Sequence, residues 1–223
     1  MPEAFCFDMY GTLFDTQSVA AAVREHIDAP DPVVADLVEL WRRKQLQYSY
    51  QVALMEAYEP FWNVTEHALE YSLTFYKIDQ DAVDTGAILQ SYEHLSPYDD
   101  AVAALDALSD RDVHLSILSN GNPSMLETLA ANAGLDGYFE AIISADEVST
   151  FKPAPAVYQN AAARLGEAIE DCWLISSNAW DVAGAAQAGM SVAWVNRANE
   201  PQERIGGEPT ETVDTLEALP GLL

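Results

Sequence analysis

The chain has 223 residues, which suits one α/β domain, or such a domain with a smaller insert, around a substantial apolar core. Its 36 acidic and 10 basic residues give a net charge of -26, which excludes nucleic acid and anionic lipid surfaces as partners. Hydrophobic residues make up 49% of the chain, but no apolar run approaches ~18 residues, so we expect a soluble globular protein without a membrane span.

The first residues, MPEAFCFDMY, lack the basic start and the small-residue cleavage site of a signal peptide, so we expect a cytoplasmic protein. The acidic residues are spread along the chain rather than gathered in one tail. Such self-repulsion is tolerable in concentrated salt, where the Debye length shrinks to about 3 Å at 1 M. The charge therefore favours a protein of a high-salt cytoplasm, and an ordinary acidic protein of a low-salt organism is the alternative.

Five apolar runs have the length of a strand, and each becomes polar at its C-terminal end. This pattern is typical of parallel strands that are buried on both faces. The predicted strands are AFCFDMY (4–10), VHLSILSN (113–120), EAIISADEV (140–148), CWLISSN (172–178) and SVAWVNR (191–197).

The stretch from 17 to 96 has no clear strand, and its apolar residues recur at helical spacing. We predict about four helices inserted after the first strand, with Pro97 marking the return to the main domain. The helical segments are SVAAAVREHI (18–27), DPVVADLVELWRRKQLQYSYQVALMEAY (31–58), FWNVTEHALEYSLTFY (61–76) and DAVDTGAILQSYEHL (81–95).

Helix-length segments also separate the later strands. Asn122 is the expected cap and Pro123 the first residue of one of them, and the Ala- and Gly-rich segment 179–189 is expected to pack closely on the sheet. Residues 200–213 are interpreted as a polar connection to a last short helix. This alternation predicts a doubly wound parallel sheet, with residues 1–15 and 97–223 as the core domain and 16–96 as a helical cap domain.

Polar residues of interest cluster at the carboxyl ends of the predicted strands, where open α/β sheets bind their ligands. A helical insert after the first strand would cover the same edge as a lid. The clusters are Asp8, Ser119 with Asn120, the loop of Lys152, and the run from Ser176 to Asp181.

The two cysteines, Cys6 and Cys172, lie inside apolar runs and are interpreted as buried thiols that only pack. Together with four scattered histidines they show no metal-ligand spacing.

Six stretches from residue 7 to 197 resemble the haloacid dehalogenase superfamily, and within it the type II 2-haloacid dehalogenases, in order and spacing. They are FDMYGTLFDTQSV, LWRRKQLQYS, LSNGNPSML, FKPAPAVY, SSNAWDVAGAAQAGM and WVNR. The resemblance implies a Rossmann-like core with a cap inserted after the first strand, and a nucleophilic carboxylate at Asp8.

Phosphatases of the superfamily also attack through this carboxylate, so Asp8 alone does not identify the reaction. The residues that a phosphatase would have and this chain lacks distinguish the two reactions. A phosphatase needs a general acid that protonates the departing alkoxide. It also needs Mg²⁺, which offsets the repulsion between the carboxylate and the phosphate group. The acid usually lies two residues after the nucleophile, where this chain has Tyr10, and a metal-binding acid usually stands where it has Ser177. A halide leaves without a proton, and donors can hold a 2-halocarboxylate without a metal, so we expect no metal and no cofactor.

The implied reaction has two steps. Asp8 attacks C2 of the haloacid from behind the halogen and forms an ester with release of halide. Water then attacks the ester carbonyl carbon, which releases a 2-hydroxy acid and restores Asp8. The resemblance also implies that (S)-2-haloacids are converted to (R)-2-hydroxy acids.

The resemblance assigns further roles. Lys152 would keep Asp8 ionised, Thr12 would bond Asp8 or the ester, and Arg42 would receive the halide. Asp181, Asn178 and Ser176 would organise Lys152 and the hydrolytic water. The expected substrate-binding residues are Tyr10, Ser119, Asn120, Arg42, Leu46, Phe61, Tyr158 and Trp180.

Several alternatives stay open from the sequence. Arg43 competes with Arg42 for the halide, Trp62 is a further candidate for the apolar wall, and Asp15 has no role beyond capping the insert. A Mg²⁺-dependent phosphatase and a non-catalytic module that binds small carboxylates are the rival functions. The expected partners are a small 2-halocarboxylate and water, and a homodimer paired through the insert is left open.

Overall fold

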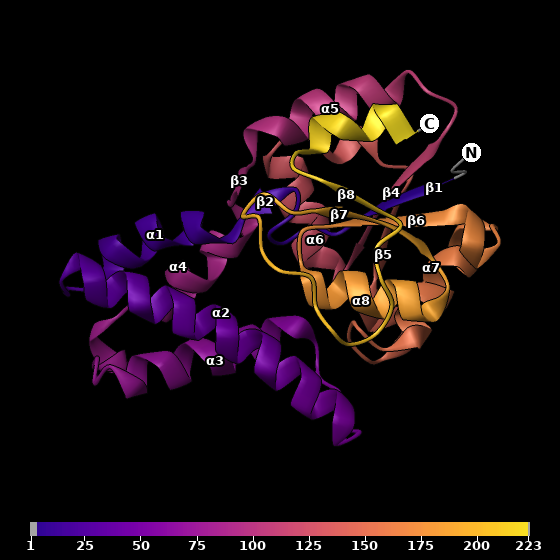
Figure 1. Cartoon of the computed structure of the whole chain (residues 1–223). Helices are drawn as coiled ribbons and strands as arrows, with labels where there is room; N and C mark the ends of the chain where they lie inside the picture. Colours follow the sequence, from indigo (N-terminus) through magenta and orange to yellow (C-terminus); the bar gives the residue numbers. More distant parts are fainter. Residues whose placement is uncertain (1–3, 223) are drawn as a thin grey trace.

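Six parallel strands form the main sheet, in the order β5-β4-β1-β6-β7-β8, in the computed structural model, which describes residues 4–222 (Figure 1). The strands are β1 (Ala4–Phe7), β4 (His114–Ser119), β5 (Ala141–Ser144), β6 (Cys172–Ser176), β7 (Ser191–Val195) and β8 (Glu211–Val213). The order reverses on the two sides of β1, which confirms the predicted doubly wound sheet. Such a switch point is where α/β sheets bind ligands.

Alternation along β1 shows how the two faces of the sheet are filled. Phe5 and Phe7 belong to one apolar cluster, and Ala4 and Cys6 belong to another, as a period of two residues requires. Figure 1 shows helices on both faces. The first cluster contains side chains of α5 (Asp99–Ser109), α6 (Pro123–Asn132) and the 3-10 helix η7 (Leu216–Leu222), and the second contains side chains of α7 (Pro155–Leu165) and α8 (Ala179–Ala188).

Both cysteines are fully buried and unpaired, as predicted. Burial raises the pKa of the Cys6 thiol to about 11 and that of Cys172 to about 12. Since the thiolate is the reactive form, these side chains act as packing residues.

The insert between β1 and α5 is helical, as predicted, and lies to one side of the sheet (Figure 1). Its α-helices are α1 (Val19–His26), α2 (Asp31–Leu54), α3 (Phe61–Phe75) and α4 (Thr85–Gln90). Short 3-10 helices join the elements of the chain: η1 (Thr16–Ser18), η2 (Gln80–Ala82), η3 (Ser91–Glu93), η4 (Asp136–Tyr138), η5 (Ala145–Val148) and η6 (Ile169–Asp171).

A two-stranded antiparallel ribbon joins the insert to the main domain. β2 (Phe14–Asp15) pairs with β3 (Ser96–Pro97), at the two places where the chain leaves and re-enters the main domain. Asp15 accepts the N–H of Gln17 at 2.8 Å and so caps the first turn of the insert. We propose on this basis that 16–96 form the cap domain and that 1–15 and 97–223 form the core, of which 1–3 and 223 lie outside the described residues.

Three local predictions were wrong. The first and third strands end at Phe7 and Ser144, earlier than predicted, because a turn follows Phe7 and the 3-10 helix η5 follows Ser144. The segment interpreted as a polar connection contains β8, an edge strand whose exposed side chains hide its pairing in the sequence. Asn122 is the N-cap residue of α6, as predicted, but its side chain accepts the N–H of Trp62 in α3 at 3.1 Å and makes no capping hydrogen bond to its own helix.

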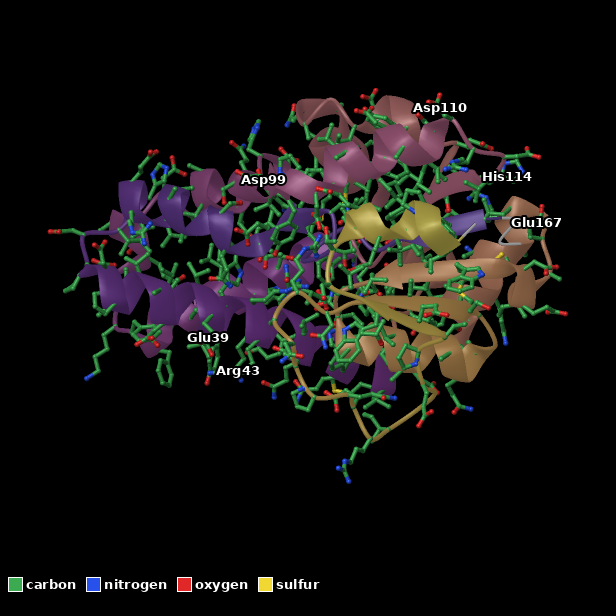
Figure 2. The ribbon with its side chains drawn as sticks, turned by 45° about the horizontal axis from the view of Figure 1, so that its top comes forward. Glu39, Arg43, Asp99, Asp110, His114 and Glu167 are labelled. Atoms are coloured by element: carbon green, nitrogen blue, oxygen red, sulfur yellow. The ribbon has the colours of Figure 1, made fainter. Side chains whose placement is uncertain are left out.

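The described chain is rich in acids that no base neutralises, and Asp99 and Asp110 lie at the surface (Figure 2). Exposed ion pairs such as Arg43–Glu39 and His114–Glu140 contribute only about 0–1 kcal/mol each. Among residues 4–222, no helix is both long enough and apolar enough to cross a membrane.

Potassium chloride should raise the thermal stability of the protein. Because salt screens the repulsion among surface carboxylates, we expect the melting temperature to increase steadily between low and molar KCl. Calorimetry or circular dichroism in a KCl series measures this. A melting temperature that stays constant or falls over the series would contradict a high-salt origin.

Gly184 lies where α8 closely approaches the loop before α7. A Cβ atom at Gly184 would lie 2.4 Å from Cβ of Pro153 and 2.8 Å from the hydroxyl oxygen of Tyr158. The Gly-rich helix therefore packs on the loop and α7 as well as on the sheet, which brings Asp181 of α8 close to Lys152.

Gly184→Ala should destabilise the protein by about 1–3 kcal/mol through overpacking, although alanine favours a helix interior by about 1 kcal/mol. Urea unfolding measures the change. Gly86→Ala in α4 is the matched control, because its nearest neighbour, Oδ1 of Asp84, is 3.4 Å away. Equal free energies of unfolding for the two variants would show that the loop containing Pro153 moves aside without an energetic cost.

Candidate functional site

Asp8 follows directly after β1, at the carboxyl edge of the sheet. Its N–H donates to the carbonyl oxygen of Ile175 in β6 at 2.9 Å, and only 4% of the residue is exposed. Three donors hold its carboxylate. Oδ1 accepts from Nζ of Lys152 at 3.2 Å, and Oδ2 accepts from the Thr12 hydroxyl at 3.0 Å and from Nδ2 of Asn178 at 2.6 Å.

The turn after Asp8 places Thr12 beneath the carboxylate. Gly11 has a φ of +89°, a conformation that side chains disfavour, and the turn closes as the N–H of Phe14 donates to the carbonyl of Met9 at 3.0 Å. The Thr12 hydroxyl also accepts the N–H of Ser177 at 2.8 Å. Because that acceptance orients the hydroxyl proton, Thr12 is fixed as a donor to Asp8.

Lys152 lies between two buried carboxylates. Its Nζ is 2.7 Å from Oδ2 of Asp181 and 3.2 Å from Oδ1 of Asp8, while 1% of Lys152 and none of Asp181 is exposed. Burial opposes the charge of Lys152, but the two carboxylates outweigh it and raise the pKa of Lys152. The ammonium is therefore retained beside Asp8 at neutral pH.

Neighbouring elements hold this ion-pair chain in place. The Tyr158 hydroxyl of α7 donates to Oδ1 of Asp181 at 2.7 Å, and the N–H of Lys152 donates to Oδ1 of Asn120 at 2.8 Å. Asn178 donates from Nδ2 to the carbonyl of Tyr10 at 3.0 Å, and its N–H donates to the buried hydroxyl of Ser176 at 3.1 Å. The structure thus brings together all the residues that the sequence predicted around Asp8 and Lys152.

A small cavity lies in front of Asp8, between the core and the insert. Every residue that lines it was predicted from the sequence, and α2 and α3 contribute one side of the wall. The lining residues are Asp8, Tyr10, Arg42, Leu46, Phe61, Ser119, Asn120 and Trp180.

The two neighbouring arginines of α2 differ in placement. Arg42 lines the cavity and donates to Oε1 of Gln45 at 2.6 Å, and Gln45 in turn donates to the Thr65 hydroxyl of α3 at 2.7 Å. Arg43 is largely exposed and lies beside Glu39 on the outer side of α2 (Figure 2). Arg43 is thus a solvated helix charge. The other open candidate, Trp62, packs against the core and does not line the cavity.

Arg197, which the sequence analysis gave no role, ties the site to the rest of the core. Its guanidinium donates to the Ser177 hydroxyl at 2.7 Å, to the carbonyl of Thr12 at 3.1 Å and to both oxygens of Asp100 at 2.8 and 3.1 Å. The sequence did contain a clue to this role of Arg197. Arg197 ends the stretch WVNR, which runs past the end of β7 at the same carboxyl edge of the sheet as Asp8. A cation therefore stands beside Ser177.

Tyr10 points its ring into the apolar contact between core and insert. Its ring centroid lies 6.3 Å from that of Phe61 and 5.9 Å from that of Tyr92, and 3% of the residue is exposed. Burial raises the pKa of Tyr10 far above its usual range. Among residues 4–222, no group of three or more His, Cys, Asp or Glu side chains is arranged to hold a metal ion.

Comparison with known proteins gives consistent matches. A family model of haloacid dehalogenase-like hydrolases matches residues 2–189. The (S)-2-haloacid dehalogenase of Xanthobacter autotrophicus is 42% identical over 200 residues, which cover 90% of this chain and 77% of that protein. The (S)-2-haloacid dehalogenase 2 of Pseudomonas sp. (strain CBS-3) is 37% identical over 97% of this chain and 93% of its own.

A solved structure agrees in fold over the whole length. The L-2-haloacid dehalogenase of Xanthobacter autotrophicus with chloropropionic acid covalently bound superposes with a TM-score of 0.92 at 36% identity, covering 100% of this chain and 98% of that chain. The chain belongs to the haloacid dehalogenase-like hydrolase family, in the branch of the (S)-2-haloacid dehalogenases.

Proposed function

We propose that this protein hydrolyses (S)-2-haloacids to (R)-2-hydroxy acids and halide, through an ester of Asp8 and without a metal ion. The observation that carries the proposal is the arrangement of Asp8. Its carboxylate is held by Lys152, Thr12 and Asn178 and faces a cavity with an arginine in its wall. Relatives named (S)-2-haloacid dehalogenases support the substrate class.

The first step forms the ester. An oxygen of Asp8 attacks C2 of the haloacid, and the electron pair of the carbon–halogen bond leaves with the halide. Arg42 lines the same cavity and offers a guanidinium to the departing anion. No proton moves in this step, so no general acid is required next to the nucleophile.

The second step restores Asp8. Water attacks the carbonyl carbon of the ester, negative charge develops on the carbonyl oxygen, and donors already in place around Asp8 stabilise it. Asp181, which is bonded to Lys152 and Tyr158, and Ser176, which is bonded to Asn178, complete the network around the hydrolytic water. Collapse of the intermediate breaks the bond between the Asp8 carbonyl carbon and the substrate oxygen. That oxygen takes up one proton of the attacking water and leaves in the 2-hydroxy acid, and the other proton of the water is released as Asp8 returns to its carboxylate.

Ser119 and Asn120 are the proposed ligands of the substrate carboxylate. Oδ1 of Asn120 accepts from the N–H of Lys152, so its amide N–H₂ group is the one free to donate into the cavity. Leu46 and Phe61 supply apolar wall around the carbon chain, and Trp180 lines the cavity beside them.

The surroundings of Tyr10 and Ser177 favour this reaction over Mg²⁺-dependent phosphate hydrolysis. The Tyr10 ring packs against Phe61 and Tyr92, and the Ser177 hydroxyl accepts from the guanidinium of Arg197. A fixed guanidinium beside Ser177 repels a metal ion there.

A homodimer paired through the helical insert is also part of the proposal. Large apolar side chains at the ends of α2 and α3 are exposed to solvent, namely Leu54, Met55 and Phe75, and a second copy would cover them. A cytoplasmic location remains a prediction from the sequence.

Asp8→Asn should abolish halide release. The wild type should release chloride from (S)-2-chloropropionate equally with and without EDTA, and loss of the nucleophile should lower the rate about 10⁴-fold or more. An ion-selective electrode measures the chloride. Asp15→Asn is the matched control, because Asp15 caps η1 and does not line the cavity, and it should keep wild-type activity. Undiminished release by the Asp8→Asn variant, or Mg²⁺-dependent turnover of p-nitrophenyl phosphate by the wild type, would overturn the proposal.

A single turnover in H₂¹⁸O should place the heavy oxygen in Asp8. Water attacks the ester carbonyl carbon in the second step, so its oxygen stays with the enzyme and the product keeps an oxygen from Asp8. Mass spectrometry of the peptide that contains Asp8 detects the label. Label in the hydroxy acid after one turnover would instead show direct attack of water on C2.

A further inference from the structure

Two buried hydroxyl groups have no hydrogen-bond partner among residues 4–222, those of Tyr10 and Tyr50. Tyr50 lies on α2, within a stretch to which the sequence analysis gave no role beyond a helical pattern. A buried hydroxyl without a partner costs about 1–3 kcal/mol, so its presence beside an enzyme cavity indicates a partner that arrives with the ligand.

The helical geometry of α2 places Tyr50 in line with the cavity. Arg42, Leu46 and Tyr50 are spaced by four residues and therefore form one stripe on one face of the helix, with steps of about 6 Å along the axis. Arg42 and Leu46 line the cavity in front of Asp8. Tyr50 is the next residue of this stripe.

The ring of Tyr50 lines an outer apolar groove and contacts Trp180, a residue that the groove and the inner cavity share. It packs edge-on against the Trp180 ring, with centroids 5.7 Å apart. Tyr50 and Trp180 both line the outer groove, together with Leu54 and Ile205, and Trp180 also lines the inner cavity. Because the ring borders the groove while the oxygen is buried, the hydroxyl is directed toward the interior.

The charged groups of the site act on this hydroxyl. Burial raises the pKa of Tyr50, Arg42 lowers it, and Asp181 and Asp8 raise it, for a net increase above the usual value. The phenol therefore keeps its proton throughout the working range of pH. It can therefore donate a hydrogen bond to an anion without losing its proton.

We propose that the Tyr50 hydroxyl donates a hydrogen bond to the halide as it leaves C2, beside the guanidinium of Arg42. The assignment rests on the proposed function. The electron pair of the carbon–halogen bond departs with the halide, Asp8 gains the bond to C2, and Tyr50 keeps its proton. The hydrogen bond forms only as negative charge develops on the halogen, so it stabilises the transition state more than the bound haloacid.

Other acceptors are less suitable. The oxygens of Asp8 are engaged by Lys152, Thr12 and Asn178, and those of Asp181 by Lys152 and Tyr158. The proposed carboxylate ligands, Ser119 and Asn120, belong to the core side of the cavity. Arg42 and Tyr50 both belong to α2, on the cap side, so two donors converge there on one anion.

Tyr50→Phe tests the assignment, with Tyr48→Phe as the matched control. Tyr48 lies on the same helix, where its ring packs against Tyr71 of α3 at 6.2 Å, away from the cavity. The first measurement is chloride release from (S)-2-chloropropionate, whose pre-steady-state burst reports ester formation and whose steady-state phase reports ester hydrolysis. The second is chloride binding, from ³⁵Cl NMR line widths at constant ionic strength in potassium sulfate, and the third is the melting temperature.

We expect Tyr50→Phe to slow the chloride burst and to weaken chloride binding by about tenfold or more each, because a hydrogen bond to a charged group is lost. Ester hydrolysis should stay near the wild type, and the melting temperature should equal or exceed that of the wild type, because phenylalanine removes the unpartnered hydroxyl. Tyr48→Phe should change none of the four quantities. An unchanged burst and unchanged chloride binding in the Tyr50→Phe variant would overturn the assignment.

Slower hydrolysis with a normal burst would also overturn it, since the hydroxyl would then act on the water. If the wild type releases no halide, the proposed dehalogenation fails instead. Chloride binding still decides the role of Tyr50 in that case, because the NMR measurement needs no turnover: equal binding by wild type and Tyr50→Phe would refute it.

Discussion

Nζ of Lys152 lies 3.2 Å from a carboxylate oxygen of Asp8 and 2.7 Å from one of Asp181, and all three side chains are almost completely buried. Two carboxylates share one ammonium, so this buried group keeps a net negative charge. An uncompensated buried charge is costly: loss of one partner of a buried ion pair destabilises a protein by about 3–5 kcal/mol. The excess negative charge therefore needs further hydrogen-bond donors around it. The hydroxyls of Thr12 and Tyr158 and the amide of Asn178 meet this need. Much of the architecture serves to deliver these donors from separate elements to one edge of the sheet.

The overall charge of the chain makes this arrangement more demanding. Only ten basic residues are available, and three of them are committed to the site region: Lys152 between the carboxylates, Arg42 in the cavity wall, and Arg197 between Ser177 and Asp100. Each of these three is held by hydrogen bonds or ion pairs with neighbouring side chains. The same chain leaves its exposed acids largely unmatched, so cations are concentrated where an anionic substrate would have to be bound and an anion released.

The sequence predicted the parts of the fold that rest on local patterns. Continuous apolar runs indicated the buried strands, helical spacing indicated the insert, and polar residues at strand ends indicated Asp8, Lys152 and Asp181. It could not predict β8 or the β2–β3 ribbon, because their few residues pair through the backbone and carry no apolar pattern. Arg197 and Tyr50 were missed for another reason. Their meaning lies in contacts with residues far along the chain, and the sequence alone could separate neither Arg42 from Arg43 nor Tyr50 from Tyr48.

The wall of the cavity has a consequence for the timing of turnover. Arg42, Leu46 and Phe61 come from the cap, and Asp8, Ser119 and Asn120 come from the core, so the binding surface exists in full only when the two domains meet. Across that boundary the structure shows few polar links, among them the N–H of Trp62 to Asn122 and the Tyr58 hydroxyl to Asp146. If molecules with the two domains apart are populated, the apparent affinity for a haloacid or a halide is the intrinsic affinity multiplied by the fraction of molecules in which the domains meet. Residues such as Asn122, which contact no substrate, can change the apparent affinity through that fraction alone.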